Sequence, residues 1–375
     1  MLKKIVLMVG ILLMAHSLLA DNLYVNGATG NDSLAIANGS TAFKTIQTAL
    51  DNAKPGDQII VEGKNKNKQI IYSERLIIEK GSVKLVGKNN PLLQGKNITK
   101  TKNNNIRTTS AIFINNHSVS ISGLTIKNFA VSVGKKNKLY TLGDVDNAAI
   151  YSAPDMIGLK IHDNIIENCD FGIYLTSPVQ CRVENNKINK IGSESNNEYV
   201  GIGIAIVPGG IGMEENVIKD NIISNATEFG IAFGGIDMKI DAEASVIENN
   251  KIKSCGKAGM ALYDFEGIVN IRLNEFVNNG SALFFGGTPI DAIIKNNKFM
   301  GSKSKIEVYA NDKYDPALLY RLWQDYDNDF AKPTFAISAL KINEIVKTGE
   351  HICIFNAEAE ANKYFDEKKN RLVKK

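Results

Sequence analysis

The sequence repeats one phrase, an asparagine followed by any residue and then by Ile or Phe, as in Asn186-Lys187-Ile188, Asn250-Lys251-Ile252 and Asn297-Lys298-Phe299. Where the phrase follows an apolar-alternating strand, its asparagines are Asn164, Asn186, Asn221, Asn250, Asn274 and Asn297, at successive steps of 22, 35, 29, 24 and 23 residues. Such a period, with several short strands in each repeat, is typical of a parallel β-solenoid. Stacked repeats bury a continuous apolar core that no single repeat can form.

The chemistry of asparagine suits a repeated turn. A tight turn between two strands favours left-handed backbone, which asparagine adopts more readily than most other residues. When the turn recurs once per coil, each side-chain amide can donate a hydrogen bond to the amide oxygen of the next coil. We therefore expect the six asparagines to sit at left-handed positions, to form a ladder, and to have a structural role.

The N-terminal part predicts a cap for the solenoid. Apolar side chains recur at helical spacing in the segment that starts at Phe43 and ends at Ala53, and Pro55-Gly56 follows. This pattern predicts an amphipathic helix near 41–53. Such a helix would cover the open end of the solenoid and protect its first strand from pairing with other chains.

With these features the chain resembles the right-handed parallel β-helix proteins of the pectate-lyase-like superfamily. The resemblance spans about residues 22–310 and is sharpest in Leu23-Tyr24-Val25-Asn26-Gly27, in Phe43 to Leu50, in Ala53 to Val61 and in Tyr72-Ser73-Glu74. It implies an all-β, single-domain, right-handed parallel β-helix of about ten coils. Pectate lyases, chondroitinase B and alginate lyases share the N-terminal pattern, so the resemblance also implies a polysaccharide partner.

The two ends of the chain differ from the repeats. Residues 1–20 predict a secretory signal peptide, with Lys3 and Lys4 before an apolar run and with cleavage after Ser17 or Ala20; the alternative is a retained anchor. The predicted β-helix then covers 21–310. Residues 311–375 predict a C-terminal helical extension, with helices near 316–323 and 357–374.

Composition excludes several classes of protein. The chain has 375 residues, 44 % hydrophobic and 22 % charged, which is close to the globular average and excludes disorder as the main state. The net charge of +4 is too small to indicate a nucleic-acid partner. Beyond the leader, no stretch of about 18 apolar residues predicts a membrane span. We therefore expect a secreted or periplasmic monomer.

Strands of the type Gly172-Ile173-Tyr174-Leu175 predict one long outer wall. We expect two outward columns: Phe113, Tyr151, Tyr174, Gly203, Ala232, Ala261 and Leu283, and beside them Asn115, Ala153, Thr176, Ala205, Gly234, Tyr263 and Phe285. Gly and Ala occupy the middle of this wall and aromatic residues occupy both ends. The pattern predicts a groove that admits a sugar chain, with Tyr151, Tyr174, Tyr263 and Phe285 as substrate-binding residues. The alternative is a flat wall covered by loops or by the C-terminal tail.

Two functions follow from the resemblance and the wall. The first is a lyase that binds and cleaves a uronic-acid-containing glycan by β-elimination, which needs a base and positive charge at the sugar carboxylate. Its candidate catalytic residues are Lys239, Lys257, Asp264 and Glu266, and its candidate Ca²⁺ ligands are Asp237, Asp264 and Glu266.

The second function is a non-catalytic carbohydrate-binding, surface or structural β-helix protein. The outward columns contain neither stacked acids nor any Lys or Arg, which favours this alternative over a lyase. The paired-Asp and Gly-His-Gly motifs of polygalacturonase-type hydrolases are also missing from the sequence. A lyase is therefore the expected activity, ahead of a hydrolase, if the protein is an enzyme.

Overall fold

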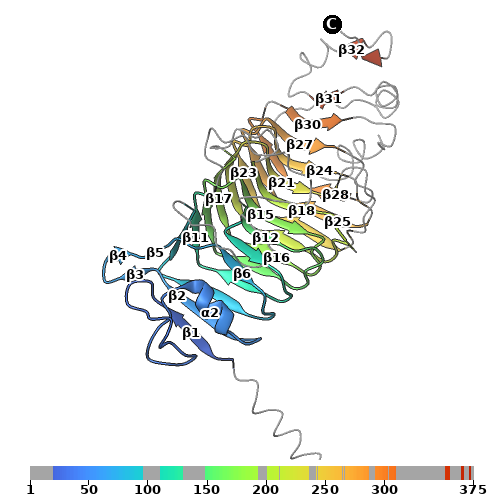
Figure 1. The fold of residues 1–375 in the computed structure, drawn as a ribbon. Helices are drawn as coiled ribbons and strands as arrows, with labels where there is room; N and C mark the ends of the chain where they lie inside the picture. The colour runs from blue at the N-terminus through green and yellow to red at the C-terminus, as the bar shows by residue number, and fades with distance from the viewer. Residues whose placement is uncertain are drawn as a thin grey trace, which may run out of the picture.

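The computed structural model describes residues 20–95, 110–129, 148–192, 201–210, 212–235, 242, 244–263, 265, 267–286 and 292–302, and the backbone alone of 304–309, 351–354, 365–366 and 371–372. Figure 1 shows an elongated stack of short strands, with the N-terminal strands and the helix at one end. Three long sheets form the walls of the stack in this part of the chain.

Within each sheet, neighbouring strands come from successive coils of the stack. The first sheet contains β1 (Asn22–Val25), β2 (Gln58–Glu62), β7 (Lys84–Lys88), β10 (Ser120–Ser122), β13 (Lys160–His162), β16 (Arg182–Glu184), β19 (Val217–Lys219), β22 (Ser245–Glu248), β25 (Val269–Arg272) and β28 (Ala292–Lys295). The second contains β5 (Ile71–Tyr72), β8 (Leu92–Gln94), β11 (Thr125–Lys127), β14 (Ile165–Glu167), β17 (Lys187–Ile191), β20 (Ile222–Ala226), β23 (Lys251–Lys253), β26 (Glu275–Val277) and β29 (Lys298–Met300). The third contains β6 (Leu76–Ile78), β9 (Ile112–Ile114), β12 (Ala148–Ser152), β15 (Phe171–Thr176), β18 (Ile202–Val207), β21 (Phe229–Phe233), β24 (Ala258–Leu262), β27 (Ser281–Phe285), β30 (Ser304–Tyr309) and β31 (His351–Ile354).

Each coil contributes one strand to each sheet, and stacked strands pair in parallel register. In the first sheet the inward positions form a column of aliphatic side chains that are at most 1 % exposed: Ile161, Val183, Ile218, Ile247, Ile271 and Ile294. Apolar burial along this continuous core is the main driving force for the fold. The prediction of an all-β parallel solenoid of about ten coils is confirmed.

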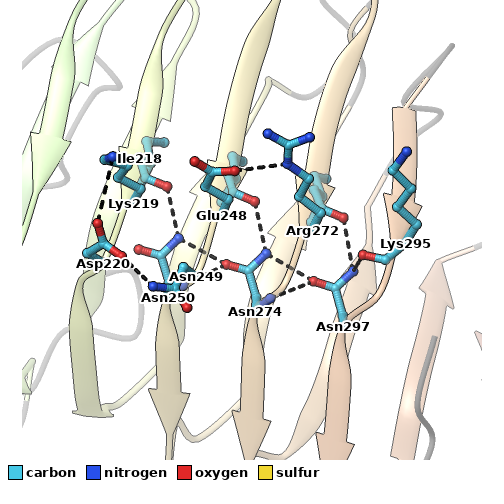
Figure 2. Close-up of polar contacts among 12 residues, drawn as sticks. Ile218, Lys219, Asp220, Glu248, Asn249, Asn250, Arg272, Asn274, Lys295 and Asn297 are labelled. Atoms are coloured by element: carbon cyan, nitrogen blue, oxygen red, sulfur yellow. Dashed lines mark hydrogen bonds and ion pairs between the residues drawn. The ribbon is translucent and has the colours of Figure 1, made fainter. Parts of the chain in front are cut away.

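The asparagine ladder forms where the first sheet turns into the second (Figure 2). All six asparagines are at most 1 % exposed. Each side-chain amide from Asn164 to Asn274 donates to the amide oxygen of the next asparagine at 2.9–3.1 Å. Each amide also donates to a backbone carbonyl of the first sheet, and the backbone N–H of each asparagine from Asn164 to Asn274 donates to the next asparagine's oxygen. The ladder prediction is confirmed.

The left-handed backbone of this turn lies one residue earlier than predicted. The residues directly before the ladder asparagines have φ between 54° and 57°: Asp163, Asn185, Asp220, Asn249, Leu273 and Asn296. The ladder asparagines themselves are absent from the positive-φ set. Their amides must point inward to stack, so the preceding residue makes the turn. The prediction that the ladder asparagines are left-handed is wrong.

Among the six left-handed residues before the ladder asparagines, Leu273 is the one that is neither Asn nor Asp. Its replacement tests the cost of the left-handed backbone at this turn. Leu273 is 55 % exposed and has a φ of 57°. Left-handed backbone costs a residue with a Cβ about 1–2 kcal/mol, and asparagine tolerates it better. We expect Leu273→Asn to raise the free energy of unfolding by about 1 kcal/mol, measured by urea unfolding.

Ile222→Asn is the matched control for this substitution. Ile222 is 40 % exposed in strand β20 and has no positive φ. This variant also removes an exposed apolar side chain, but it does not change a residue with left-handed backbone. An equal gain in both variants would show that backbone conformation at position 273 is not the cause.

The predicted N-terminal cap is confirmed as helix α2 (Ile46–Asn52), with Ile46, Ala49 and Leu50 buried against the core. Its first turn is held by Glu74, whose carboxylate accepts from the backbone N–H groups of Ile46 and Gln47 at 3.0 Å. Burial raises the pKa of Glu74, and these two hydrogen bonds oppose that shift. Phe43 donates its N–H to the Tyr24 carbonyl, so the chain after the first strand covers the edge of β1.

The C-terminal part departs from the repeats. Strand β31 pairs antiparallel with β30 and ends the third sheet. The short strands β32 (Phe365–Asp366) and β33 (Arg371–Leu372) form an antiparallel pair where the sequence predicts a helix over 357–374. The predicted helix at 316–323 lies outside the described residues. Among the residues described, no helix is long and apolar enough to cross a membrane.

Candidate functional site

The candidate site lies on the outer face of the third sheet. Strands β15, β18, β21 and β24 each carry a glycine in the same register position: Gly172, Gly203, Gly230 and Gly259. A Cβ at any of these glycines would lie 2.2–2.9 Å from the carbonyl oxygen of the next coil. The column therefore has no space for a side chain. Phe171, directly before the glycine, and Tyr174, two residues after it, pack together in a cluster separate from the main core.

A first aromatic cluster covers the N-terminal part of this face. Phe113 stacks on Tyr151 at 5.5 Å between ring centres, and Tyr151 meets Tyr174 edge-on at 5.9 Å. Phe171 packs edge-on against Tyr174 at 5.6 Å. Tyr151 is half-buried and the other three rings are buried. Burial raises the pKa of the Tyr174 hydroxyl to about 12, and the adjacent Tyr151 adds to the shift.

A second cluster lies further along the same face and carries charge. Phe284 packs 5.8 Å from Phe229 and 6.5 Å from Tyr263. The Lys257 ammonium lies 5.6 Å from the centre of the Phe229 ring and 2.6 Å from a carboxylate oxygen of Glu228. Burial raises the pKa of the Tyr263 hydroxyl to about 12, and the charge of Glu228 acts in the same direction. Tyr263 and Phe284 keep partial exposure.

Three alanines separate the two clusters. Ala205, Ala232 and Ala261 form one outward column in register between Tyr174 and Phe284. They are at most 3 % exposed. The predicted floor of small residues between aromatic ends is therefore present, but its alanines are buried and expose almost no surface.

The predicted columns need correction in two coils. In β18 the outward residues are Ala205 and Val207, two positions later than predicted, because Gly203 and not Gly201 occupies the glycine column. In β27 the register is shifted by one, because Ala282 takes the place of the glycine. Phe284 therefore faces outward and Phe285 faces the core, where it is fully buried. The prediction that Phe285 lines the outer wall is wrong.

Most of the predicted chemical residues lie outside the described residues: Lys239, Asp264, Glu266 and Asp237. Lys257 is described and is 61 % exposed, at the edge of the candidate face. Within the described ranges, no group of three His, Cys, Asp or Glu side chains is arranged to hold a metal ion. The sequence interpretation missed Phe171, Phe229 and Phe284. The aromatic residue directly before the glycine in Phe171-Gly172 and Phe229-Gly230 was the available signal for the first two.

Comparison with known proteins agrees with this fold. Residues 148–315 match the family model described as the right handed beta helix region. A polygalacturonase from Erwinia carotovora ssp. carotovora superposes with a TM-score of 0.53 at 14 % identity, covering 78 % of this chain and 79 % of the other. The GH136 lacto-N-biosidase from Eubacterium ramulus superposes with a TM-score of 0.51 at 14 % identity, covering 74 % of this chain and 56 % of the other.

A third solved structure, XylC in complex with xylose, superposes with a TM-score of 0.51 at 13 % identity, covering 74 % of this chain and 65 % of the other. The chain thus spans less than two thirds of the lacto-N-biosidase and of XylC. No curated protein sequence matches this chain. Identities this low show a shared fold alone. The chain has a right-handed parallel β-helix fold, and the resemblance to the pectate-lyase-like superfamily is confirmed at that level.

Proposed function

We propose that this protein binds a polysaccharide along the outer face of the third sheet. The observation that carries the proposal is the pair of aromatic clusters on this face, with partly exposed rings at Tyr151, Tyr263 and Phe284. Four coil steps separate the strands of Tyr151 and Tyr263, or about 19 Å at the spacing of stacked strands. That span accommodates several consecutive sugar rings.

The chemistry of these side chains suits a sugar chain. An aromatic ring offers an apolar face to the C–H face of a pyranose, and a tyrosine adds a hydroxyl for hydrogen bonding. The Tyr263 hydroxyl is protonated at neutral pH, as in any tyrosine, and can donate to a sugar oxygen. The right-handed β-helix fold is also that of a polygalacturonase and a lacto-N-biosidase, which supports a glycan partner.

The charged edge of the face favours an acidic polymer. The Lys257 ammonium is exposed beside the second cluster, where it could meet a uronic-acid carboxylate. Its contact with Glu228 at 2.6 Å also keeps it oriented toward the ring of Phe229. We place this interaction outside the cytoplasm, with the protein secreted or periplasmic.

The second candidate function is β-elimination on the same polymer, favoured by the exposed lysine at this edge. In that reaction Lys257 or Lys239 would remove the proton α to the sugar carboxylate. Asp237, Asp264 and Glu266 would bind Ca²⁺, and the charge of this ion would neutralise the sugar carboxylate. The Lys257–Glu228 contact is made by the protonated amine, whereas a base must first lose that proton. This contact supports binding as the first proposal and catalysis as the second.

A screen of acidic polymers tests both candidates. Purified residues 21–375 would be mixed with pectate, alginate, chondroitin and heparin-type chains, with and without calcium. We expect saturable binding to at least one polymer by affinity electrophoresis. A rise in ultraviolet absorbance from unsaturated uronate would establish the lyase as well. A folded sample that binds none of these polymers would contradict the proposal.

A further inference from the structure

The strongest unassigned feature is the environment of Asp21, at the start of the first sheet. Every polar group of this residue is engaged. Its backbone N–H donates to Oδ1 of Asp57 at 2.9 Å, and its carbonyl accepts from the Gln58 N–H at 2.9 Å. Its carboxylate accepts from the Asn38 amide at 2.5 Å and lies 3.9 Å from the Lys54 ammonium. The fold therefore holds the nitrogen of residue 21 in one place.

The acceptor of that nitrogen is a buried carboxylate. Asp57 is 3 % exposed, and its other oxygen accepts from the Lys54 backbone N–H at 2.8 Å. Within the described part of the chain, no Lys, Arg or His side chain forms an ion pair with Asp57. A buried carboxylate held only by amide N–H groups is stabilised further by a cation, since buried charges are costly without a counter-charge.

We propose that the Ala20–Asp21 bond is the processing site of the leader, and that the α-ammonium group released on Asp21 pairs with the buried Asp57. In this step a leader peptidase of the exporting cell hydrolyses the peptide bond. The oxygen of water joins the carbonyl carbon of Ala20, which becomes a carboxylate. The nitrogen of Asp21 becomes a primary amine and takes a proton. The hydrogen bond of 2.9 Å between an uncharged N–H and the Asp57 carboxylate then becomes an ion pair between an ammonium and a carboxylate.

The geometry selects Ala20 over Ser17 as the last residue of the leader. Ala20 supplies the small residue that a leader cleavage site carries directly before the cleaved bond. Cleavage after Ser17 would leave Leu18, Leu19 and Ala20 ahead of Asp21, and would put the new ammonium three residues away from Asp57. This inference rests on the leader and is independent of the proposed glycan function.

The first test is the mass of the exported protein. The full chain would be expressed in a bacterial host and the processed form recovered from the periplasm or medium. Intact mass and N-terminal sequencing are expected to show a chain that begins at Asp21. A chain that begins at Leu18, or one that keeps the leader, would overturn the proposal.

The second test measures the ion pair through the pH dependence of unfolding. The charged groups that face the new amine are the carboxylates of Asp57 and Asp21, which raise its pKa, and the Lys54 ammonium, which opposes them. An amine with a raised pKa contributes stability that is complete below its unfolded pKa of about 7.7–8.0 and is lost as pH rises through its folded pKa. The chain 21–375 should therefore lose stability between about pH 8 and pH 10.

The matched control is a chain that begins at Ala20, which moves the amine by one residue. Both chains would be released from a fusion by a protease that leaves no extra residue, and unfolded in urea. We expect the unfolding equilibrium constant of 21–375 to rise about tenfold more than that of 20–375 over this pH range, as for a pKa shift of one unit. Asp57→Asn should abolish the difference. Parallel pH profiles for 21–375 and 20–375 would contradict the ion pair.

Discussion

Replacing Asn250 with alanine is expected to lower the free energy of unfolding by about 4 kcal/mol, because several buried groups lose their partners at once. The Asn250 amide donates to the Ile218 carbonyl and to the side chain of Asn274. Its oxygen accepts both from the backbone N–H and from the side-chain amide of Asn221. None of these groups reaches water, since Asn250 is 1 % exposed. The measurement is the midpoint and slope of urea unfolding, followed by circular dichroism.

The matched control is the adjacent Asn249, which Figure 2 shows beside Asn250. Asn249 is exposed, has a φ of 54°, and donates to the side chain of Asp220. Asn249→Ala should cost only about 1 kcal/mol, mainly through the left-handed backbone. Similar losses for the two variants would mean that the inward amide ladder does not carry the stability we assign to it.

Gly230→Ala is expected to be the second most damaging change, at about 3 kcal/mol, because there is no space for a methyl group. A Cβ on Gly230 would lie 2.3 Å from Cγ2 of Ile252 and 2.6 Å from the carbonyl oxygen of Gly259. The first contact pushes on a core side chain and the second on the backbone of the next coil. Both neighbours would have to shift. Urea unfolding would measure the loss.

Ala282→Gly makes the reverse change in strand β27, where Ala282 occupies the position of the glycine column. Ala282 is fully buried, so the variant loses one methyl group and gains chain entropy in the unfolded state, at a cost of about 1–2 kcal/mol. A tolerated Gly230→Ala, with a loss no larger than that of Ala282→Gly, would refute the steric explanation of the glycine column.

The sequence predicts the fold well because an asparagine recurs at the same point of successive coils. A ladder asparagine must recur wherever its neighbour needs a partner, so Asn164 to Asn297 locate six coils directly. The N-terminal helix was also predictable, since the spacing of Ile46, Ala49 and Leu50 is helical and Pro55-Gly56 follows. The left-handed position was misassigned, because five of the six turns have two adjacent polar residues and the sequence does not show which one points inward.

The candidate face was less predictable because its register depends on the glycine column. Two glycines compete for that column around β18, and the strand Ser281–Phe285 has none, so alternation alone placed Phe285 outward. A shift of one residue exchanges the two faces of a strand, which is why Phe284 was missed. The predicted acids and Lys239 lie outside the described residues, and the repeat pattern of the sequence gives them no position. Their roles stay predictions.

The most direct test of the proposed function is a calorimetric titration of the tightest-binding acidic polymer into the purified protein and two tyrosine variants. Tyr263→Ala should weaken binding about tenfold, the equivalent of one lost aromatic contact of about 1.4 kcal/mol. Tyr24→Ala removes a ring that is 45 % exposed on the first sheet, and should leave the affinity unchanged. If Tyr24→Ala weakens binding as much as Tyr263→Ala, with both variants folded, the glycan does not bind at the outer face of the third sheet.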